Sequence, residues 1–203
     1  MSEDAALPPL RPVTKLYLWW LFAAAASTTF ALLAVADHLR AGQIALAVAL
    51  AAAVTAAYVV PLNGGHRVVH TLETVAILPA IFLLPPGVAM LIAVCGTLIA
   101  HPLRSHAWWL APNLRRMSWA ETIFNSSSMA LQAGAAALAL GLIGWEVATP
   151  HFDLPLPILA VGVTGLTIYL VQWVALAGVV SFQERIPLPT VLHDMTIGKQ
   201  PAE

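Results

Sequence analysis

Residues 68–103 read VVHTLETVAILPAIFLLPPGVAMLIAVCGTLIAHPL, an apolar run that is broken by Pro85-Pro86-Gly87. A membrane span needs about 20 mostly apolar residues, with about 17 as the lower limit. The run is therefore either one long, kinked span or two short spans, 68–84 and 87–103. Two prolines followed by glycine cannot continue a helix, and they supply a tight reversal. Each half would be about 26 Å long, slightly short of the hydrocarbon core.

Composition and hydropathy place the whole chain in the helical membrane class. Hydrophobic residues make up 60% of the sequence, charged residues only 9%, and the mean hydropathy is +0.82. Soluble domains carry about 25% charged residues, so this chain has too few charges to cover a surface that faces water. Four further stretches are long and apolar enough to span a membrane. They are Leu16–Ala36, Ile44–Leu62, Ser118–Gly144 and Ile158–Val180.

The distribution of Lys and Arg favours two spans within residues 68–103, and hence six in total. Cytoplasmic loops are enriched in these residues. With six spans and a cytoplasmic N-terminus, all but one of the nine Lys and Arg residues lie inside, whereas five spans leave more of them outside. We therefore predict an all-α, polytopic membrane helix bundle in the bacterial inner membrane, with the Pro-Pro-Gly turn between spans three and four. The membrane domain covers residues 16–183, and the tails 1–15 and 184–203 are cytoplasmic.

Tryptophan and arginine indicate which segments lie at the membrane surface. The segment His101–Met117 mixes tryptophans with arginines, and these residues favour the headgroup region and its cytoplasmic side. We expect this segment to lie along the inner interface. Trp19 and Trp20 are expected at the inner end of the first span, and Trp145 at the outer end of the fifth.

The fifth span carries a polar stripe, formed by Glu121, Asn125, Ser128 and Gln132. At 100° per residue these four side chains lie within about 60° of one another, on one helix face. Polar groups at membrane depth are costly, so the stripe is expected to face other helices or a ligand. The sequence favours hydrogen bonding between helices, with a small-molecule site as the alternative. Glu121 has a third interpretation, as a first-turn carboxylate at the interface.

The sequence predicts neither catalysis nor a metal site. His66, His70 and Glu73 share one helix face, but three ligands on one helix rarely all point at one ion, so an ordinary interfacial face is favoured. Nucleophilic motifs, phosphate-binding loops and cysteine-pair metal motifs are absent, and the single Cys95 cannot form an internal disulfide. We therefore expect no enzyme, no metal and no cofactor. The net charge of −1 also predicts no nucleic-acid partner.

Three stretches carry a pattern that goes beyond hydropathy: HTLETVAILPAIFLLPPGVAMLIAVCGTLIAHPLR (70–104), ETIFNSSSMALQAGAAALALGLIG (121–144) and VSFQERIPLPTVLHD (180–194). Their main features are Glu73 at the start of the third span, a Pro/Gly break, and the pair Phe124-Asn125 early in the fifth. The pattern resembles the N-terminal multi-span sensory module of bacterial cyclic-di-GMP signalling proteins, which precedes GGDEF, EAL or HD-GYP output domains. The resemblance covers residues 60–195 and implies ligand sensing.

More distantly, the pattern is similar to the substrate-binding membrane subunits of energy-coupling-factor vitamin transporters. The signalling resemblance implies a sensory or ligand-binding module in the lipid bilayer, acting through a membrane protein partner, a second copy, or an output domain beyond this chain. The alternatives are a subunit that captures a small molecule for transport and a structural subunit of a larger complex. The family pattern places Glu73 near the stripe, so the expected ligand site is Glu73, Glu121, Asn125, Ser128 and Gln132.

Overall fold

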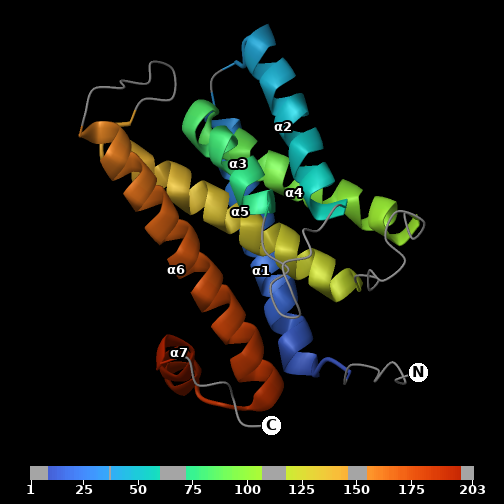
Figure 1. Ribbon diagram of the computed structural model, residues 1–203. Helices are drawn as coiled ribbons and strands as arrows, with labels where there is room; N and C mark the ends of the chain where they lie inside the picture. Colours follow the sequence, from blue (N-terminus) through green and yellow to red (C-terminus); the bar gives the residue numbers. More distant parts are fainter. Residues whose placement is uncertain (1–8, 37, 60–71, 107–117, 146–154, 198–203) are drawn as a thin grey trace.

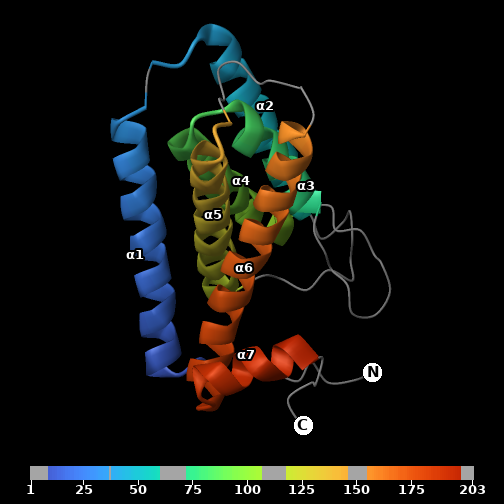
Figure 2. The ribbon, with the colours of Figure 1, turned by 90° about the vertical axis from the view of Figure 1, so that its left-hand side faces the viewer.

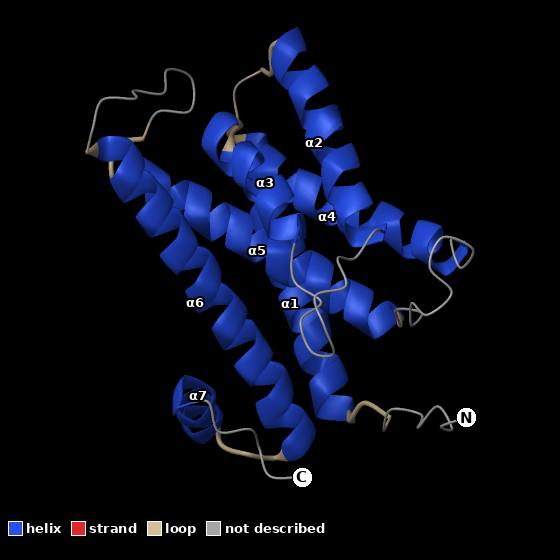
Figure 3. Ribbon diagram, viewed as in Figure 1, coloured by secondary structure: helices blue, strands red, loops and turns tan. Residues whose placement is uncertain are grey.

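The computed structural model describes residues 9–36, 38–59, 72–106, 118–145 and 155–197, and this part of the chain forms helices and no strand (Figures 1 and 3). Five of these helices are long and apolar enough to cross a membrane, as in a multi-pass membrane protein, and the apolar helix α3 is shorter. The helices are α1 (Pro12–Ala34), α2 (Ala41–Val59), α3 (Leu72–Leu83), α4 (Pro86–His106), α5 (Trp119–Leu142), α6 (Leu156–Glu184) and α7 (Leu188–Ile197).

Each predicted span overlaps one helix, but several ends differ. The run 68–103 contains two helices, α3 and α4, separated by Leu84 and Pro85. Helix α4 continues to His106, so the segment predicted at the inner interface begins within the last turns of α4. Residues 107–117 lie outside the described part of the chain. Helix α7 lies within the predicted C-terminal tail and was not predicted. A ten-residue helix is too short to be recognised by its apolar pattern.

Helix α5 lies at the centre of the bundle (Figure 2). Of its membrane-length window 61% is buried, against 22% for α1 and α6 and 17% for α2. Its buried residues are mostly small, including the run Ser126-Ser127-Ser128 and the alanines Ala133 and Ala136. Small side chains let neighbouring backbones approach closely. In lipid, where the hydrophobic effect does not favour contact between helices, such close packing stabilises their association. Neighbouring helices therefore enclose α5 on nearly all sides.

The outer helices turn large apolar side chains away from the bundle. Phe30 in α1, Val48 in α2 and Leu170 in α6 are among those more than half exposed. A water-soluble protein rarely exposes a continuous apolar surface of this kind. The pattern matches a bundle whose outer helices contact lipid.

Helix α4 contacts α1 and α2 through two glycines that leave no room for a side chain. A Cβ atom built on Gly87 would lie 2.6 Å from the backbone nitrogen of Leu33. A Cβ atom built on Gly96 would lie 2.5 Å from Cγ1 of Val54. The first contact is with backbone, which cannot move aside as a flexible side chain does. Gly87 therefore fixes the distance between α1 and α4.

The opposite end of α1 is bound to α6. The side-chain oxygen Oε1 of Gln183 accepts hydrogen bonds from the backbone nitrogen of Arg11 at 3.2 Å and from the hydroxyl of Thr14 at 3.0 Å. One turn further along α1, the hydroxyl of Tyr17 donates to the carbonyl of Ala175 at 3.2 Å. Helix α1 thus begins beside the end of α6, and α7 lies across that end of the bundle (Figure 2).

Trp145 fixes the other end of α5. Its indole nitrogen donates to the carbonyl of Phe82 at 3.2 Å, and the two rings meet edge to face with centroids 5.4 Å apart. Trp145 follows the last turn of α5, where it was expected, but its side chain is buried rather than presented to a membrane surface. The ring therefore joins α5 to α3.

Replacing Gly87 by alanine is expected to lower the thermal unfolding midpoint in detergent by several degrees. The added methyl group must push α1 away from α4, and such overpacking costs about 1–3 kcal/mol. The matched control is Gly162→Ala in α6, because a Cβ atom there meets nothing within 4 Å. Alanine also favours a helix over glycine by about 1 kcal/mol, so the control should unfold at the wild-type temperature or above. Equal midpoints for the two variants would contradict this account.

Candidate functional site

Helix α5 separates two hollows. The stripe residues Asn125, Ser128 and Gln132 line one of them, which we name the polar cavity. Ser126 and Ser127 line the other, which we name the apolar crevice. At 100° per residue the two sets of side chains point in roughly opposite directions from the helix axis. The serine run thus lies between both hollows at one level of the bundle.

The polar cavity is small and is enclosed by four helices. Its volume is about 50 Å³, and its polar lining comes from α2, α3, α5 and α6. Inside it, the side-chain nitrogen of Gln132 donates to the hydroxyl of Ser128 at 3.0 Å. The lining residues are Tyr58, Thr74, Phe124, Asn125, Ser128, Met129, Gln132 and Gln172.

The size of the polar cavity decides what can occupy it. A buried water needs about 10–15 Å³ of such volume, whereas sites for small organic ligands measure about 300–1,000 Å³. The cavity therefore has room for a few water-sized groups. Within the described residues, the side-chain amides of Asn125 and Gln172 have no hydrogen-bond partner, so water molecules would satisfy them. This geometry suits a hydrated polar contact between helices.

The predicted site residues separate into three groups. Asn125, Ser128 and Gln132 do line one cavity. Glu121 does not: its carboxylate accepts from the backbone nitrogen of Ser118 at 2.7 Å, and the Ser118 hydroxyl accepts from the backbone nitrogen of Glu121 at 3.2 Å. This capping box satisfies the first turn of α5. Glu73 is the second residue of α3, and its side chain lies outside the described part.

The predicted face of His66, His70 and Glu73 cannot be placed, because both histidines also lie outside the described residues. Elsewhere in the described chain, no group of three His, Cys, Asp or Glu side chains could hold a metal ion.

Sequence analysis missed three polar residues that line the cavity, namely Tyr58, Thr74 and Gln172. Gln172 carried a usable signal, since it is a single amide inside the long apolar helix α6. Tyr58 and Thr74 carried none, because each occurs near a helix end where polar residues are common. Only the packing of α3 against α5, and of α2 against α3 and α4, brings them to the stripe.

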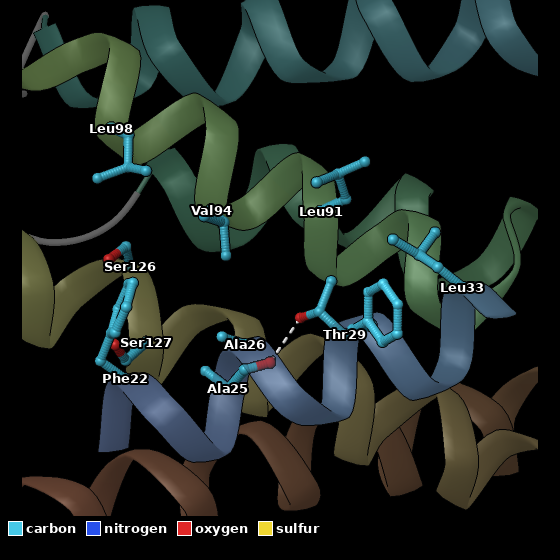
Figure 4. Close-up of a pocket in the computed structure, with 11 residues that line it drawn as sticks. Phe22, Ala25, Ala26, Thr29, Leu33, Leu91, Val94, Leu98, Ser126 and Ser127 are labelled. Atoms are coloured by element: carbon cyan, nitrogen blue, oxygen red, sulfur yellow. Dashed lines mark hydrogen bonds between the residues drawn. The ribbon is translucent and has the colours of Figure 1, made fainter. Parts of the chain in front are cut away.

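The apolar crevice lies between α1, α4 and α5 (Figure 4). Its volume is about 300 Å³. Eleven residues line it: Phe22, Ala25, Ala26, Thr29, Phe30, Leu33, Leu91, Val94, Leu98, Ser126 and Ser127. The crevice lies between the two places where α1 is held, Gly87 at one end and Gln183 at the other. Helix α1 bridges the bundle there without filling the space beneath it.

Ser127 is a polar group of the crevice wall that lacks a partner. Its side chain is only 1% exposed, and its hydroxyl makes no hydrogen bond within the described residues. The other hydroxyls of the wall are satisfied, since Ser126 donates to the carbonyl of Ile123 at 3.2 Å and Thr29 to that of Ala25 at 2.7 Å. An unpaired hydroxyl at this depth costs about 1–3 kcal/mol on protein scales. A hydrogen-bond acceptor in the crevice would recover that energy once a small movement of the covering side chains or of α5 uncovers the hydroxyl.

A double-mutant cycle on Gln132 and Ser128 measures the strength of the polar stripe. Gln132→Ala removes the bond in the polar cavity, and the unfolding free energy in mixed micelles is expected to fall. The coupling between Gln132→Ala and Ser128→Ala should be about 0.5–1.5 kcal/mol, the usual range for one hydrogen bond. Leu138→Ala on the exposed face of α5 serves as the control, and its cycle with Ser128→Ala should be additive. Additivity of the Gln132 cycle as well would show that this hydrogen bond, which lies within α5, adds nothing to the stability of the fold.

Comparisons of this chain with protein-family models, with curated proteins and with solved structures gave no match. Any function assigned to the two hollows must therefore be inferred from the geometry of this chain alone.

Proposed function

We propose that this chain is a non-enzymatic, multi-pass protein of the bacterial inner membrane that binds a small apolar ligand in the crevice between α1, α4 and α5. One observation carries the proposal: the unpaired, fully enclosed hydroxyl of Ser127 in a crevice of about 300 Å³. The ligand is a compact hydrophobic molecule with a single hydrogen-bond acceptor, such as a carbonyl oxygen. The module is of the sensory kind, as the sequence resemblance implies.

The size and walls of the crevice support this ligand class. A cavity of about 150 Å³ lined by apolar side chains can hold a benzene molecule, and this crevice is about twice as large. Its volume is at the lower end of the range for small-molecule sites. Phe30 lines the crevice and is 76% exposed, so the edge of the crevice reaches the outer surface of the bundle. A ligand dissolved in the bilayer can enter from that side.

Helix α5 offers a physical route from the ligand to the rest of the bundle. The crevice serines Ser126 and Ser127 are next to Ser128, which accepts the hydrogen bond from Gln132 on the opposite face. The polar cavity there also contacts Gln172 of α6. A rotation of α5 that brings Ser127 toward a ligand also moves Ser128 within the polar cavity. Because α7 follows α6 after a short turn, a movement of α6 can be transmitted to the end of the bundle.

The proposal includes six membrane crossings, with both termini in the cytoplasm. Helices α3 and α4 support it, because they are separate helices on either side of Pro85, and the carbonyl of Pro85 accepts from the backbone nitrogens of Val88 and Ala89. Helix α3 is about 18 Å long, so it crosses only part of the hydrocarbon core. The bias of Lys and Arg supports the orientation.

Cysteine labelling tests the six crossings. In a Cys95→Ser background, a cysteine at Gly64 is expected to react only from the cytoplasmic side and a cysteine at Leu83 only from the outer side. A cysteine at the exposed Glu184, the last residue of α6, is the reference for the cytoplasmic side. Reaction of the Gly64 and Leu83 positions from one side would mean that α3 does not cross the membrane.

Binding of acetophenone tests the ligand site. This probe combines an aromatic ring with one carbonyl acceptor, and ethylbenzene is its matched control without the acceptor. Purified protein in detergent should bind acetophenone about fivefold more tightly than the Ser127→Ala variant does, since one hydrogen bond contributes about 1 kcal/mol. Ethylbenzene should bind the two proteins equally, as measured by saturation-transfer NMR.

A second variant tests the contribution of the volume of the crevice rather than that of the Ser127 hydroxyl. Ala26→Phe places a large ring in the crevice and should abolish binding of both probes. The proposal is wrong if acetophenone binds Ser127→Ala as tightly as the wild type, or if Ala26→Phe leaves binding unchanged.

A further inference from the structure

A third hollow lies where α1 begins and α6 ends, away from the crevice and the polar cavity. Its volume is about 280 Å³. Two segments far apart in the sequence form it, the first residues of α1 and the last turn of α6. The lining residues are Arg11, Pro12, Val13, Ser181, Phe182 and Arg185. This hollow therefore brings two arginines together from opposite ends of the membrane domain.

The framework of the hollow is fixed by hydrogen bonds from both segments. Gln183 holds the start of α1 through the backbone nitrogen of Arg11 and the hydroxyl of Thr14. Ser181 donates to the carbonyl of Ile186 at 2.7 Å, across the turn after α6. Arg185 forms this turn in the left-handed backbone region, with φ of 62°. The positions from which the two arginine side chains extend are thus set by the fold.

The charges of the hollow are unbalanced. Arg11 and Arg185 both line it, no carboxylate does so in the described structure, and neither guanidinium has an ion pair there. Lys15 lies one turn along α1 from Arg11, on the same side of the helix, and adds a third positive charge nearby. The acidic residue Glu184 is adjacent in sequence but does not line the hollow. Two guanidinium groups that line one hollow without a carboxylate favour an anion there.

The position of the hollow matches the surface of a membrane. It lies at the end of α1 and α6, the end of the bundle across which α7 lies (Figure 2). Further along α1, Trp19 and Trp20 are more than half exposed, and tryptophan prefers the interface between headgroups and hydrocarbon. Val13 lines the hollow with an exposed apolar side chain, next to the arginines. Charged and apolar groups meet in this way where a lipid headgroup joins its chains.

We infer that this hollow binds the phosphate group of an anionic phospholipid, held by the guanidinium groups of Arg11 and Arg185. Arginine binds phosphate oxygens with two parallel hydrogen bonds, which fits a fixed site better than a flexible lysine would. The lipid's glycerol region would then contact Val13 and Phe182 at the start of the apolar surface. Such a lipid would join α1 to α6 at the same end as Gln183, so its binding should stabilise the fold.

The test uses the full-length protein, delipidated in a neutral detergent. Its thermal unfolding midpoint is measured alone and with phosphatidylglycerol, phosphatidylcholine or inorganic phosphate. Phosphatidylglycerol is expected to raise the midpoint by about 3 °C or more, since a ligand that binds only the folded state stabilises it. Phosphatidylcholine and inorganic phosphate should give much smaller rises. A rise with inorganic phosphate equal to that with phosphatidylglycerol would assign the site to a soluble phosphate compound and overturn the lipid assignment.

Substitutions of the two arginines test whether the rise in midpoint comes from binding at this hollow. The double variant Arg11→Gln with Arg185→Gln should lose most of the phosphatidylglycerol rise, whereas Arg40→Gln, outside this hollow, should keep it. The midpoint of each variant without lipid is measured first, and Arg185→Lys provides a milder change that keeps the charge but loses the planar fork. In the wild type, high salt should reduce the rise, because an ionic contact is screened. The inference is wrong if the double variant, or the wild type in high salt, shows the full rise.

Discussion

The close approach of α1 to α4 at Gly87 is the constraint on which the bundle depends. A side chain at this position would collide with the backbone of Leu33, so the two helices are as near there as their main chains allow. The far end of α1 is held separately, by Gln183 of α6. Between these two points α1 packs closely against α5 and less extensively against α4. The crevice is the space that remains.

The two hollows beside α5 differ in whether their buried polar groups have hydrogen-bond partners. In the polar cavity, a serine and a glutamine pair with each other, and the remaining amide groups share a space the size of a few waters. In the crevice, Ser127 faces apolar walls and finds no partner. The first arrangement satisfies polar groups within α5, whereas the second leaves a cost that a bound molecule could remove. This difference is the reason for proposing the crevice, and not the polar cavity, as the ligand site.

The sequence predicts helices and the polar stripe well, because both follow from local periodicity. Asn125, Ser128 and Gln132 share one face of any straight helix, so their meeting at one cavity needed no tertiary information. Glu121 has the same periodicity but belongs to a capping box with Ser118, a pattern visible in the sequence as Ser-x-x-Glu. The crevice could not be predicted, since it arises from the path of α1 between two distant contacts. The position of Arg11 and Arg185 in one hollow likewise depends on which helix ends meet in the folded chain.

The enclosure of α5 also has a consequence for biosynthesis. With three serines, an asparagine and a glutamine, α5 has the lowest hydropathy of the five helices that could cross a membrane. Alone in lipid it would expose these groups to hydrocarbon, at a cost for each. Helices α1 to α4 are synthesised before it, and α1 and α4 supply much of the surface that covers it, whereas α6 follows afterwards. The order of the helices along the chain therefore lets the least apolar span enter the bilayer against partners that are already there.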